Sequence, residues 1–269
     1  METIEIKRRG RPSKYIEPNT SSPIDFSQVQ KLDNLQIDPR MLNVMKSGLP
    51  IDELISFEGG VPCATNIMAI GDPGVGKTTL LLDLVAHIQA KNEFKCLFIS
   101  GEMGKKQMYK YTQRFPHFGV VDTLFTSDYL QHNSKDVIEQ ITNKGYDLIL
   151  IDSIAEVISN VRDDNNWDRK TAEGWLVDLC IKNNNGGNNT GIYTSFLLIQ
   201  QVTKSGEFAG SNKLKHLVDA ALEMRKDKNT EETYAIFTKN RNGNSDMRFT
   251  YQLNNTNIYY GVISRENHS

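Results

Sequence analysis

One octapeptide of this chain fits the phosphate-binding pattern GxxxxGK[ST] at every position: Gly71-Asp72-Pro73-Gly74-Val75-Gly76-Lys77-Thr78. It follows an apolar run at residues 67–70 and precedes a helical pattern that starts near Thr78. In such a loop, backbone N–H groups converge on a phosphate at a helix N-terminus, whose dipole favours an anion. We therefore expect this P-loop (Gly71–Thr78), with Thr79, to bind ATP, Lys77 to contact the β and γ phosphates, and the Thr78 hydroxyl to bind Mg²⁺. The alternative is a glycine-rich turn without a ligand.

The residues around the P-loop alternate between short β-branched runs and amphipathic stretches. Expected strands are residues 66–70, 95–100, 148–152 and 193–199, and expected helices are residues 78–91, 105–115 and 170–182. Strand–helix repetition predicts an α/β fold with a mostly parallel, doubly wound sheet. Residues 234–239, 247–253 and 258–260 are separated only by turn residues, so we expect antiparallel C-terminal hairpins at one edge. Three segments are expected to be mobile: residues 161–169, 183–191 and 204–212.

Composition is that of an ordinary globular chain: 269 residues, 38% hydrophobic and 24% charged, with a net charge of -2. No run approaches the roughly 18 apolar residues that span a bilayer, and the N-terminus lacks the apolar stretch of a secretory signal. We expect a cytoplasmic protein, in the host cytoplasm if a phage encodes it, and no membrane partner. The three cysteines, Cys63, Cys96 and Cys180, show no CxxC pairing and are expected to be core thiols.

Two acidic residues follow apolar strands. Asp152 ends the run 147–152, and Glu102 follows the run 96–100, on a strand that we expect beside the P-loop strand. Ligands of open α/β sheets bind at the carboxyl ends of the strands, so we expect Asp152 to complete the Mg²⁺ shell. A carboxylate at the position of Glu102 can orient or deprotonate a water in line with the γ phosphate. The alternatives are a strand-end cap for Asp152 and a helix-dipole partner for Glu102.

A specific family resemblance rests on motifs further along the chain. The motifs that carry the resemblance are LIQQVTKSGEFAG at residues 198–210, LKHLVD at 214–219 and KNRNG at 239–243, together with GDPGVGKTTLLL from residue 71 and the strand end Ser100-Gly101-Glu102. With these motifs, the chain resembles the bacterial RadA (Sms) DNA-repair ATPases over roughly residues 48–255. RadA is similar in turn to the DnaB helicases. Two details resemble DnaB more than RadA: the combination of Glu102-Met103 with Gln107, and Gln201 at a position where RadA usually has histidine. The resemblance implies a RecA-like P-loop NTPase core.

The resemblance also implies residue roles. Gln201 would sense the γ phosphate and pass that state to the loop 202–212, which contacts single-stranded DNA in such motors, with Lys204 and Lys213 as DNA contacts. Lys239 and Arg241 resemble the KNRFG motif, whose basic groups reach the ATP of a neighbouring subunit in a ring. The alternative is an exposed basic hairpin.

This sequence departs from the family pattern in several places. A four-cysteine zinc module and a Lon-protease-like domain are not found, and KNRFG becomes KNRNG. An arginine expected nine residues after Glu102 is Tyr111, which could stack on adenine or pack in a groove. The pattern resembles stand-alone motor cores carried by bacteriophages.

Residues 1–37 are predicted to be a basic, disordered tail, followed by an ATPase domain at 38–262 and a short polar tail at 263–269. The tail contains Arg8, Arg9 and Arg11 in the sequence KRRGRP, which has the Arg-Gly-Arg-Pro core of an AT-hook. Such a core fits the narrow minor groove of A·T-rich duplex DNA. A basic tail that contacts only phosphates is the alternative.

Three functions remain open at this stage. The first is an ATP-driven motor on single-stranded DNA for recombination or repair, by branch migration or unwinding, assembled as a hexameric ring or filament. The second is a DnaB-like replicative helicase. The third is a nucleotide-switched DNA-binding scaffold or strand-exchange filament, in which hydrolysis only resets binding.

Overall fold

The computed structural model describes residues 26–27, 29–91, 93–201, 212–227, 230–245 and 247–265, with backbone only at 201, 212, 213, 262 and 265. The chain divides into two compact units, Met1–Ile37 and Asp38–Ser269. The described part of the first unit contains a short 3-10 helix, η1 (Leu32–Asn34). No helix among the described residues is both long and apolar enough to cross a membrane.

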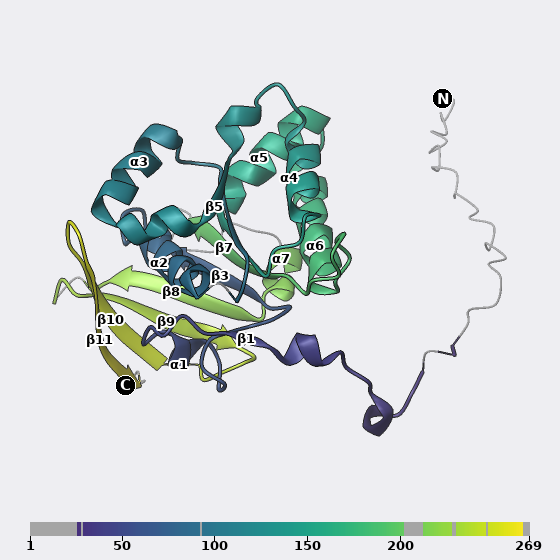
Figure 1. Ribbon diagram of the computed structural model, residues 1–269, viewed down its shortest axis with the longest axis horizontal. Helices are drawn as coiled ribbons and strands as arrows, with labels where there is room; N and C mark the ends of the chain where they lie inside the picture. Colours follow the sequence, from purple (N-terminus) through teal and green to yellow (C-terminus); the bar gives the residue numbers. More distant parts are fainter. Residues whose placement is uncertain are drawn as a thin grey trace, which may run out of the picture. The chain divides into compact units, whose positions relative to one another are not determined.

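The second unit is built on one large sheet (Figure 1). Within the described residues, nine strands follow the order β11-β10-β9-β8-β3-β7-β6-β4-β5. The six from β8 to β5 are parallel, and β8, β9, β10 and β11 pair antiparallel. The strands are β3 (Asn66–Gly71), β4 (Cys96–Ser100), β5 (Asp122–Phe125), β6 (Leu148–Asp152), β7 (Ser195–Gln201), β8 (Ala220–Lys226), β9 (Thr233–Asn240), β10 (Met247–Leu253) and β11 (Ile258–Arg265). A separate antiparallel pair joins β1 (Val44–Met45) and β2 (Val61–Pro62).

Helices cover both faces of the parallel strands. They are α1 (Asp52–Ile55), α2 (Lys77–Ala90), α3 (Lys105–Arg114), α4 (Ser134–Thr142), α5 (Ile154–Asn165), α6 (Arg169–Asn184) and α7 (Asn212–Leu217), with 3-10 turns η2 (Pro39–Leu42), η3 (Pro116–Val120) and η4 (Thr126–Tyr129). One core joins α2, α3 and η3 to one face of the sheet, and a second joins α4, α5, α6 and α7 to the other. Successive residues of β6 alternate between these cores, Leu148 and Leu150 in the first and Ile149 and Ile151 in the second, as the period of two in a strand requires.

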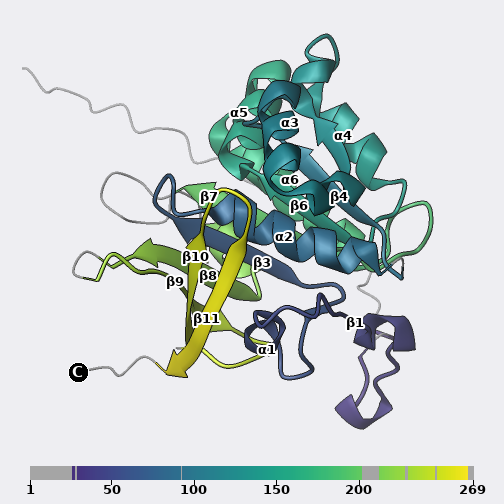
Figure 2. The same cartoon turned by 60° about the vertical axis from the view of Figure 1, so that its left-hand side comes forward.

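The C-terminal strands extend the sheet past β8 and turn beside the P-loop helix (Figure 2). This arrangement confirms the predicted α/β class, the mostly parallel sheet and the antiparallel C-terminal hairpins. The sequence prediction lacked β5, α4, α5 and β8, and also the short elements β1, β2, α1 and α7. Their sequences are short or weakly periodic, and neighbouring strands and helices supply the burial that stabilises them.

One sequence-based expectation is wrong. The strand that leads to Glu102, β4, does not lie beside the P-loop strand β3, because β7 and β6 lie between them. Strand periodicity identifies a strand but not its neighbours, since the crossover helices allow a strand to pair away from its predecessor. Two of the segments expected to be mobile begin inside helices: Val161–Asn165 ends α5, and Asn183 and Asn184 end α6. Both stretches contain fully buried residues, such as Val161 and Asn183. The third segment lies almost wholly outside the described residues.

Candidate nucleotide-binding site

The P-loop connects the end of β3 to the start of α2 through a left-handed backbone. Gly74 and Gly76 have φ angles of 83° and 93°, which are unfavourable for any residue with a side chain. At Gly71, an added Cβ would lie 2.2 Å from the carbonyl oxygen of Met224 on β8. These glycines therefore let the backbone turn closely at the N-terminus of α2, where N–H groups can face an anion.

Lys77 is buried in the first turn of α2 and its ammonium is held by backbone oxygens. Its Nζ donates to the carbonyl oxygens of Gly71 and Asp72, at 2.7 and 2.9 Å. Burial lowers the pKa of Lys77, and the negative charges of Asp152, Glu102 and Asp72 oppose that shift. The ammonium is thus positioned at the loop, with carbonyl partners that phosphate oxygens can replace.

Asp152 ends β6 and is buried beside Thr78. The Thr78 hydroxyl donates a short hydrogen bond to Oδ2 of Asp152. Burial raises the pKa of Asp152, the Thr78 hydrogen bond opposes this, and the Glu102 charge adds to it. A hydroxyl and a carboxylate oxygen beside a phosphate site fit the oxygen ligands that Mg²⁺ prefers, with waters and phosphates filling the remaining positions.

Glu102 follows β4 at the same sheet edge. Ser100 pairs with Asp152 in parallel register, and the amides of Gly101 and Glu102 donate to the Asp152 carbonyl oxygen at 2.7 and 3.3 Å. This carries the chain over the end of β6, so that Glu102 lines the same hollow as Lys77 although its strand is not beside β3. The side chain is exposed and accessible to water.

The hollow at this edge has a volume of about 420 Å³. It is lined by residues from the P-loop, α2, α3 and four strand ends: Pro73, Gly74, Gly76, Lys77, Thr78, Thr79, Glu102, Met103, Tyr111, Arg114, Asp152, Ile199 and Leu253. The structure thus brings together the residues predicted for nucleotide and metal binding, apart from Gly71, Asp72 and Val75, which belong to the same loop but do not line the hollow.

Arg114 is a lining residue that the sequence analysis missed. It lies one helical turn after Tyr111 on α3, with its guanidinium carbon 5.7 Å from the centre of the Tyr111 ring. Its Nε and Nη2 donate to the carbonyl oxygens of Asn255 and Asn254 in the β10–β11 turn, at 3.0 and 3.1 Å. A positive charge is therefore present on this helix face, three residues after the position where the resemblance implies one. Residues three positions apart share a helix face, so the spacing of Tyr111 and Arg114 could have predicted that Arg114 lines the same site.

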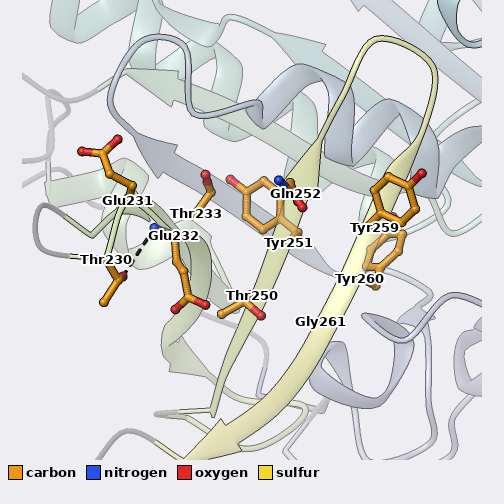
Figure 3. Close-up of a pocket in the computed structure, with 10 residues that line it drawn as sticks. All are labelled: Thr230, Glu231, Glu232, Thr233, Thr250, Tyr251, Gln252, Tyr259, Tyr260 and Gly261. Carbon is orange, nitrogen blue, oxygen red and sulfur yellow. Dashed lines mark hydrogen bonds between the residues drawn. The ribbon is translucent and has the colours of Figure 1, made fainter.

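The C-terminal strands also support the P-loop. The Tyr251 hydroxyl on β10 donates to the Val75 carbonyl oxygen at 2.6 Å, and a Cβ on Gly76 would lie 2.2 Å from Cδ1 of Leu253. Tyr251 also lines a second hollow of about 430 Å³ between the β8–β9 turn and strands β10 and β11 (Figure 3). Spacing along the chain carried no signal for a contact between residues 176 positions apart.

The predicted γ-phosphate sensor and DNA contacts are only partly described. Gln201 ends β7 and pairs in register with Gly71, so its backbone reaches the P-loop edge of the sheet. Lys213 lies in α7, where the structure describes its backbone but not its side chain. Lys204 and the tail residues Arg8, Arg9 and Arg11 lie outside the described residues.

Lys239 and Arg241 lie at the opposite edge of the sheet from the P-loop. Asn240 pairs with Ala220, whereas Gly71 pairs with Met224, four residues further along β8, a separation of about 13 Å at about 3.3 Å per residue. Lys239 Nζ donates to the carbonyl oxygens of Lys215 and Val218. Burial lowers the pKa of Lys239, the charge of Arg241 adds to this, and Asp219 opposes it.

Arg241 is held by Asp219, the residue before β8. Its Nη1 donates to Oδ1 of Asp219 at 3.1 Å, and its amide donates to the Asp219 carbonyl oxygen. The other carboxylate oxygen of Asp219 accepts from the Asn66 amide, at the start of the P-loop strand. The Arg241 side chain is 57% exposed, so it is oriented by its own chain yet open to a second molecule.

Comparison with known proteins finds one matching domain family and several curated relatives. Residues 56–182 match the AAA domain family. DNA repair protein RadA of Rickettsia prowazekii is 29% identical over 265 residues, covering 93% of this chain and 53% of that protein. RadA of Mycobacterium tuberculosis is 30% identical over 221 residues, covering 81% and 43%. The chain spans about half the length of the curated relatives it matches.

Solved structures show the same fold at lower identity. A KaiC-like protein from Pyrococcus horikoshii superposes with a TM-score of 0.62 at 18% identity, covering 81% of this chain and 99% of that one. The flagellar accessory protein FlaH from Methanocaldococcus jannaschii gives 0.58 at 13% identity, covering 82% and 100%. The resemblance to RadA and the RecA-like fold are thereby confirmed.

Proposed function

Since the chain is a homologue of RadA with an AAA domain of the RecA-like superfamily, we propose that it is a Mg²⁺-dependent ATPase that acts on single-stranded DNA in recombination or repair. The observation that carries the proposal is the convergence of Lys77, Thr78, Asp152 and Glu102 on one hollow at the carboxyl edge of the sheet. Each of these side chains matches one requirement of phosphoryl transfer.

Nucleotide binding would exchange partners that are already in place. The Lys77 ammonium would leave the carbonyl oxygens of Gly71 and Asp72 for the β and γ phosphates. Thr78 and Asp152, now hydrogen-bonded to each other, would separate to hold Mg²⁺, which neutralises the charge that develops on the phosphates. Glu102 would orient and deprotonate the attacking water.

A second copy of the chain would complete the site. Lys239 and Arg241 lie about 13 Å along the strands from their own P-loop, given about 3.3 Å per residue, and on the other edge of the sheet. They are therefore poorly placed for their own nucleotide and open to that of a neighbour. We propose a homo-oligomer, a ring or a filament, in which Lys239 and Arg241 stabilise the transition state in trans.

DNA would be bound beside the γ-phosphate sensor. The relatives' name, DNA repair protein RadA, and the position of Gln201 next to Gly71 support a coupling between nucleotide state and the segment that follows β7. Lys204 and Lys213 are the proposed phosphate contacts, which would make affinity fall with salt concentration.

The test compares ATP turnover with and without single-stranded DNA, and displacement of a labelled strand from a forked duplex. A motor predicts stimulated turnover with ATP-dependent displacement, both lost in Lys77→Ala. Stimulated turnover without displacement favours a nucleotide-switched scaffold. Turnover that ignores DNA, together with no DNA binding, contradicts the proposal.

The N-terminal tail would add duplex affinity. Removal of residues 1–17 is expected to weaken binding to A·T-rich duplex and to flatten its salt dependence, because Arg8, Arg9 and Arg11 are lost, while basal ATP turnover stays unchanged. A matched G·C-rich duplex separates groove recognition from phosphate contact. Equal salt slopes for the full and shortened chains exclude the tail as a DNA contact.

A further inference from the structure

Three potential metal ligands meet on the P-loop helix, away from the nucleotide hollow. Asp83 and His87 lie one turn apart on α2, and His117 lies in η3. One ligand atom from each side chain lies within 4.8 Å of the others. None of the three lines the hollow at the sheet edge, so the proposed ATP chemistry does not explain them.

Asp83 is a buried carboxylate with unusual partners. Its side chain is 4% exposed, Oδ1 lies 2.6 Å from Nε2 of His117, and Oδ2 accepts from the Tyr260 hydroxyl at 2.6 Å. Nδ1 of His87 lies 3.5 Å from Oδ1. Among the residues that the structure describes, the ion-pair partners of Asp83 are these two imidazoles alone. A buried carboxylate is costly unless a positive charge compensates it, and a neutral imidazole supplies none.

We propose that Asp83, His87 and His117 bind one Zn²⁺ ion. Zn²⁺ bonds of about 2.0–2.2 Å in a tetrahedron place the ligand atoms about 3.4 Å apart. The separation between His87 Nδ1 and Asp83 Oδ1, 3.5 Å, is already close to this value. His87 Nδ1 also donates to the backbone carbonyl oxygen of Asp83 at 2.8 Å, so Zn²⁺ would replace the proton that makes this bond. The His117–Asp83 contact must open by less than about 1 Å from 2.6 Å. The His117 side chain is 40% exposed at the start of a short 3-10 turn, so it has room for that movement.

The donor set and its surroundings favour zinc over magnesium. Two imidazole nitrogens and one carboxylate oxygen suit Zn²⁺, whereas Mg²⁺ prefers oxygen ligands alone. The Tyr260 hydroxyl on Oδ2 fixes the orientation of the carboxylate, as outer partners of metal ligands do. The side chains of His87 and His117 are 39% and 40% exposed, which gives a water access to the fourth position.

The ion would link helix α2, which lines the nucleotide hollow, to segments that adjoin two of its other walls. Helix α2 begins with Lys77, η3 follows the helix that carries Tyr111 and Arg114, and Tyr260 lies on β11 (Figure 3), which pairs with the strand that carries Tyr251. Zinc would therefore act as a structural clamp on the nucleotide hollow and take no part in the hydrolysis step. The proposal does not depend on DNA binding or on ATP turnover.

The test is a calorimetric Zn²⁺ titration of the tag-free full chain at pH 7.5 without nucleotide, paired with thermal unfolding in Zn²⁺ and in EDTA. We expect one equivalent to bind and the unfolding midpoint to rise. His87→Gln and His117→Gln should each weaken binding at least tenfold and remove the rise. His132→Gln, an exposed histidine outside the cluster, is the control and should match the parent.

Two outcomes overturn the proposal. The first is a parent protein that binds no Zn²⁺, which would leave the cluster as hydrogen-bonded side chains. The second is binding that the three variants share equally, which would place the ion elsewhere. Unfolding midpoints in EDTA show whether a variant is folded. Co²⁺ substitution gives an independent readout, because a four-coordinate Co²⁺ site absorbs visible light strongly. That absorption should be lost when either His87 or His117 is replaced.

Discussion

The two edges of the parallel sheet are built differently. At the carboxyl edge, Lys77 is 7% exposed and Asp152 is 4% exposed. Lys77 is held by a hydrogen bond to the Gly71 carbonyl oxygen, and Asp152 by a hydrogen bond from the Thr78 hydroxyl. At the amino edge, Arg241 is 57% exposed and is held by one carboxylate, Asp219. This difference in burial underlies the proposal that the carboxyl edge is a preformed phosphate site and that the exposed cations act on the nucleotide of a neighbouring subunit. Asp219 connects Arg241 to the central sheet at the amino edge, because its other carboxylate oxygen accepts a hydrogen bond from the backbone amide of Asn66 at the start of β3.

The largest effect is expected at the buried edge, from Lys77→Ala. Loss of the ammonium removes the point charge on the β and γ phosphates, so ATP turnover should disappear and nucleotide binding should weaken strongly. Turnover by phosphate release and binding of a fluorescent ATP analogue measure the two effects. Lys91→Ala, at the exposed C-terminal end of the same helix, is the matched control. Undiminished turnover in the Lys77 variant contradicts the whole assignment.

Glu102→Gln should separate binding from chemistry at the same edge. The amide keeps the size of the side chain but cannot accept a proton, so ATP should still bind while hydrolysis falls by about 10²–10⁴-fold. The variant should accumulate as an ATP-bound, DNA-bound assembly, seen by electron microscopy and by a DNA mobility shift. Glu156→Gln, an exposed acid on the neighbouring helix α5, should behave as the parent. Hydrolysis at the parental rate in Glu102→Gln means that the base is another residue.

Arg241→Ala tests whether the exposed edge works in trans. ATP should bind nearly normally, and turnover should fall by about 10³-fold, because an arginine finger contributes at least that much. Folding should be little affected, since an ion pair this exposed contributes less than about 1 kcal/mol. Arg225→Ala, an exposed arginine paired with Glu223 on β8, is the control.

A mixture of the two inactive variants sharpens the same comparison. Combining Arg241→Ala with Lys77→Ala creates some interfaces in which an intact P-loop meets an intact Arg241, so part of the activity should return. Mixed assembly is verified separately by co-purification of differently tagged chains. If the verified mixture stays inactive, Arg241 acts within its own subunit or only holds the β9 end to Asp219.

The smallest effect is expected from Tyr251→Phe, which leaves both edges intact and removes one support of the P-loop. The Val75 carbonyl loses its 2.6 Å hydrogen bond, and a net cost of about 1 kcal/mol corresponds to about a fivefold loss of ATP affinity. Tyr259→Phe on the neighbouring strand, 53% exposed, is the matched control. Equal affinities for the two variants would show that β10 does not stabilise the loop.

Local patterns in the chain were sufficient for the fold class and for much of the candidate site. The P-loop is contiguous, so its glycines and Lys77 are recognisable without a partner. Asp152 and Glu102 each follow an apolar strand, and the ends of parallel strands share one edge, so their convergence with the P-loop was predictable. The antiparallel C-terminal strands were predictable from their turn residues.

Contacts between distant segments were not predictable in this way. In the sheet, β7 and β6 lie between the P-loop strand β3 and the strand β4 that leads to Glu102. This order becomes visible only in the packed sheet. Tyr251 and Val75 are 176 positions apart, and His117 meets Asp83 across 34 positions. Periodicity reports which face a residue uses, whereas the neighbour on that face depends on how crossover helices and hairpins bring segments together. The support of the P-loop and the histidine cluster therefore arise from tertiary packing, which no single segment of the chain encodes.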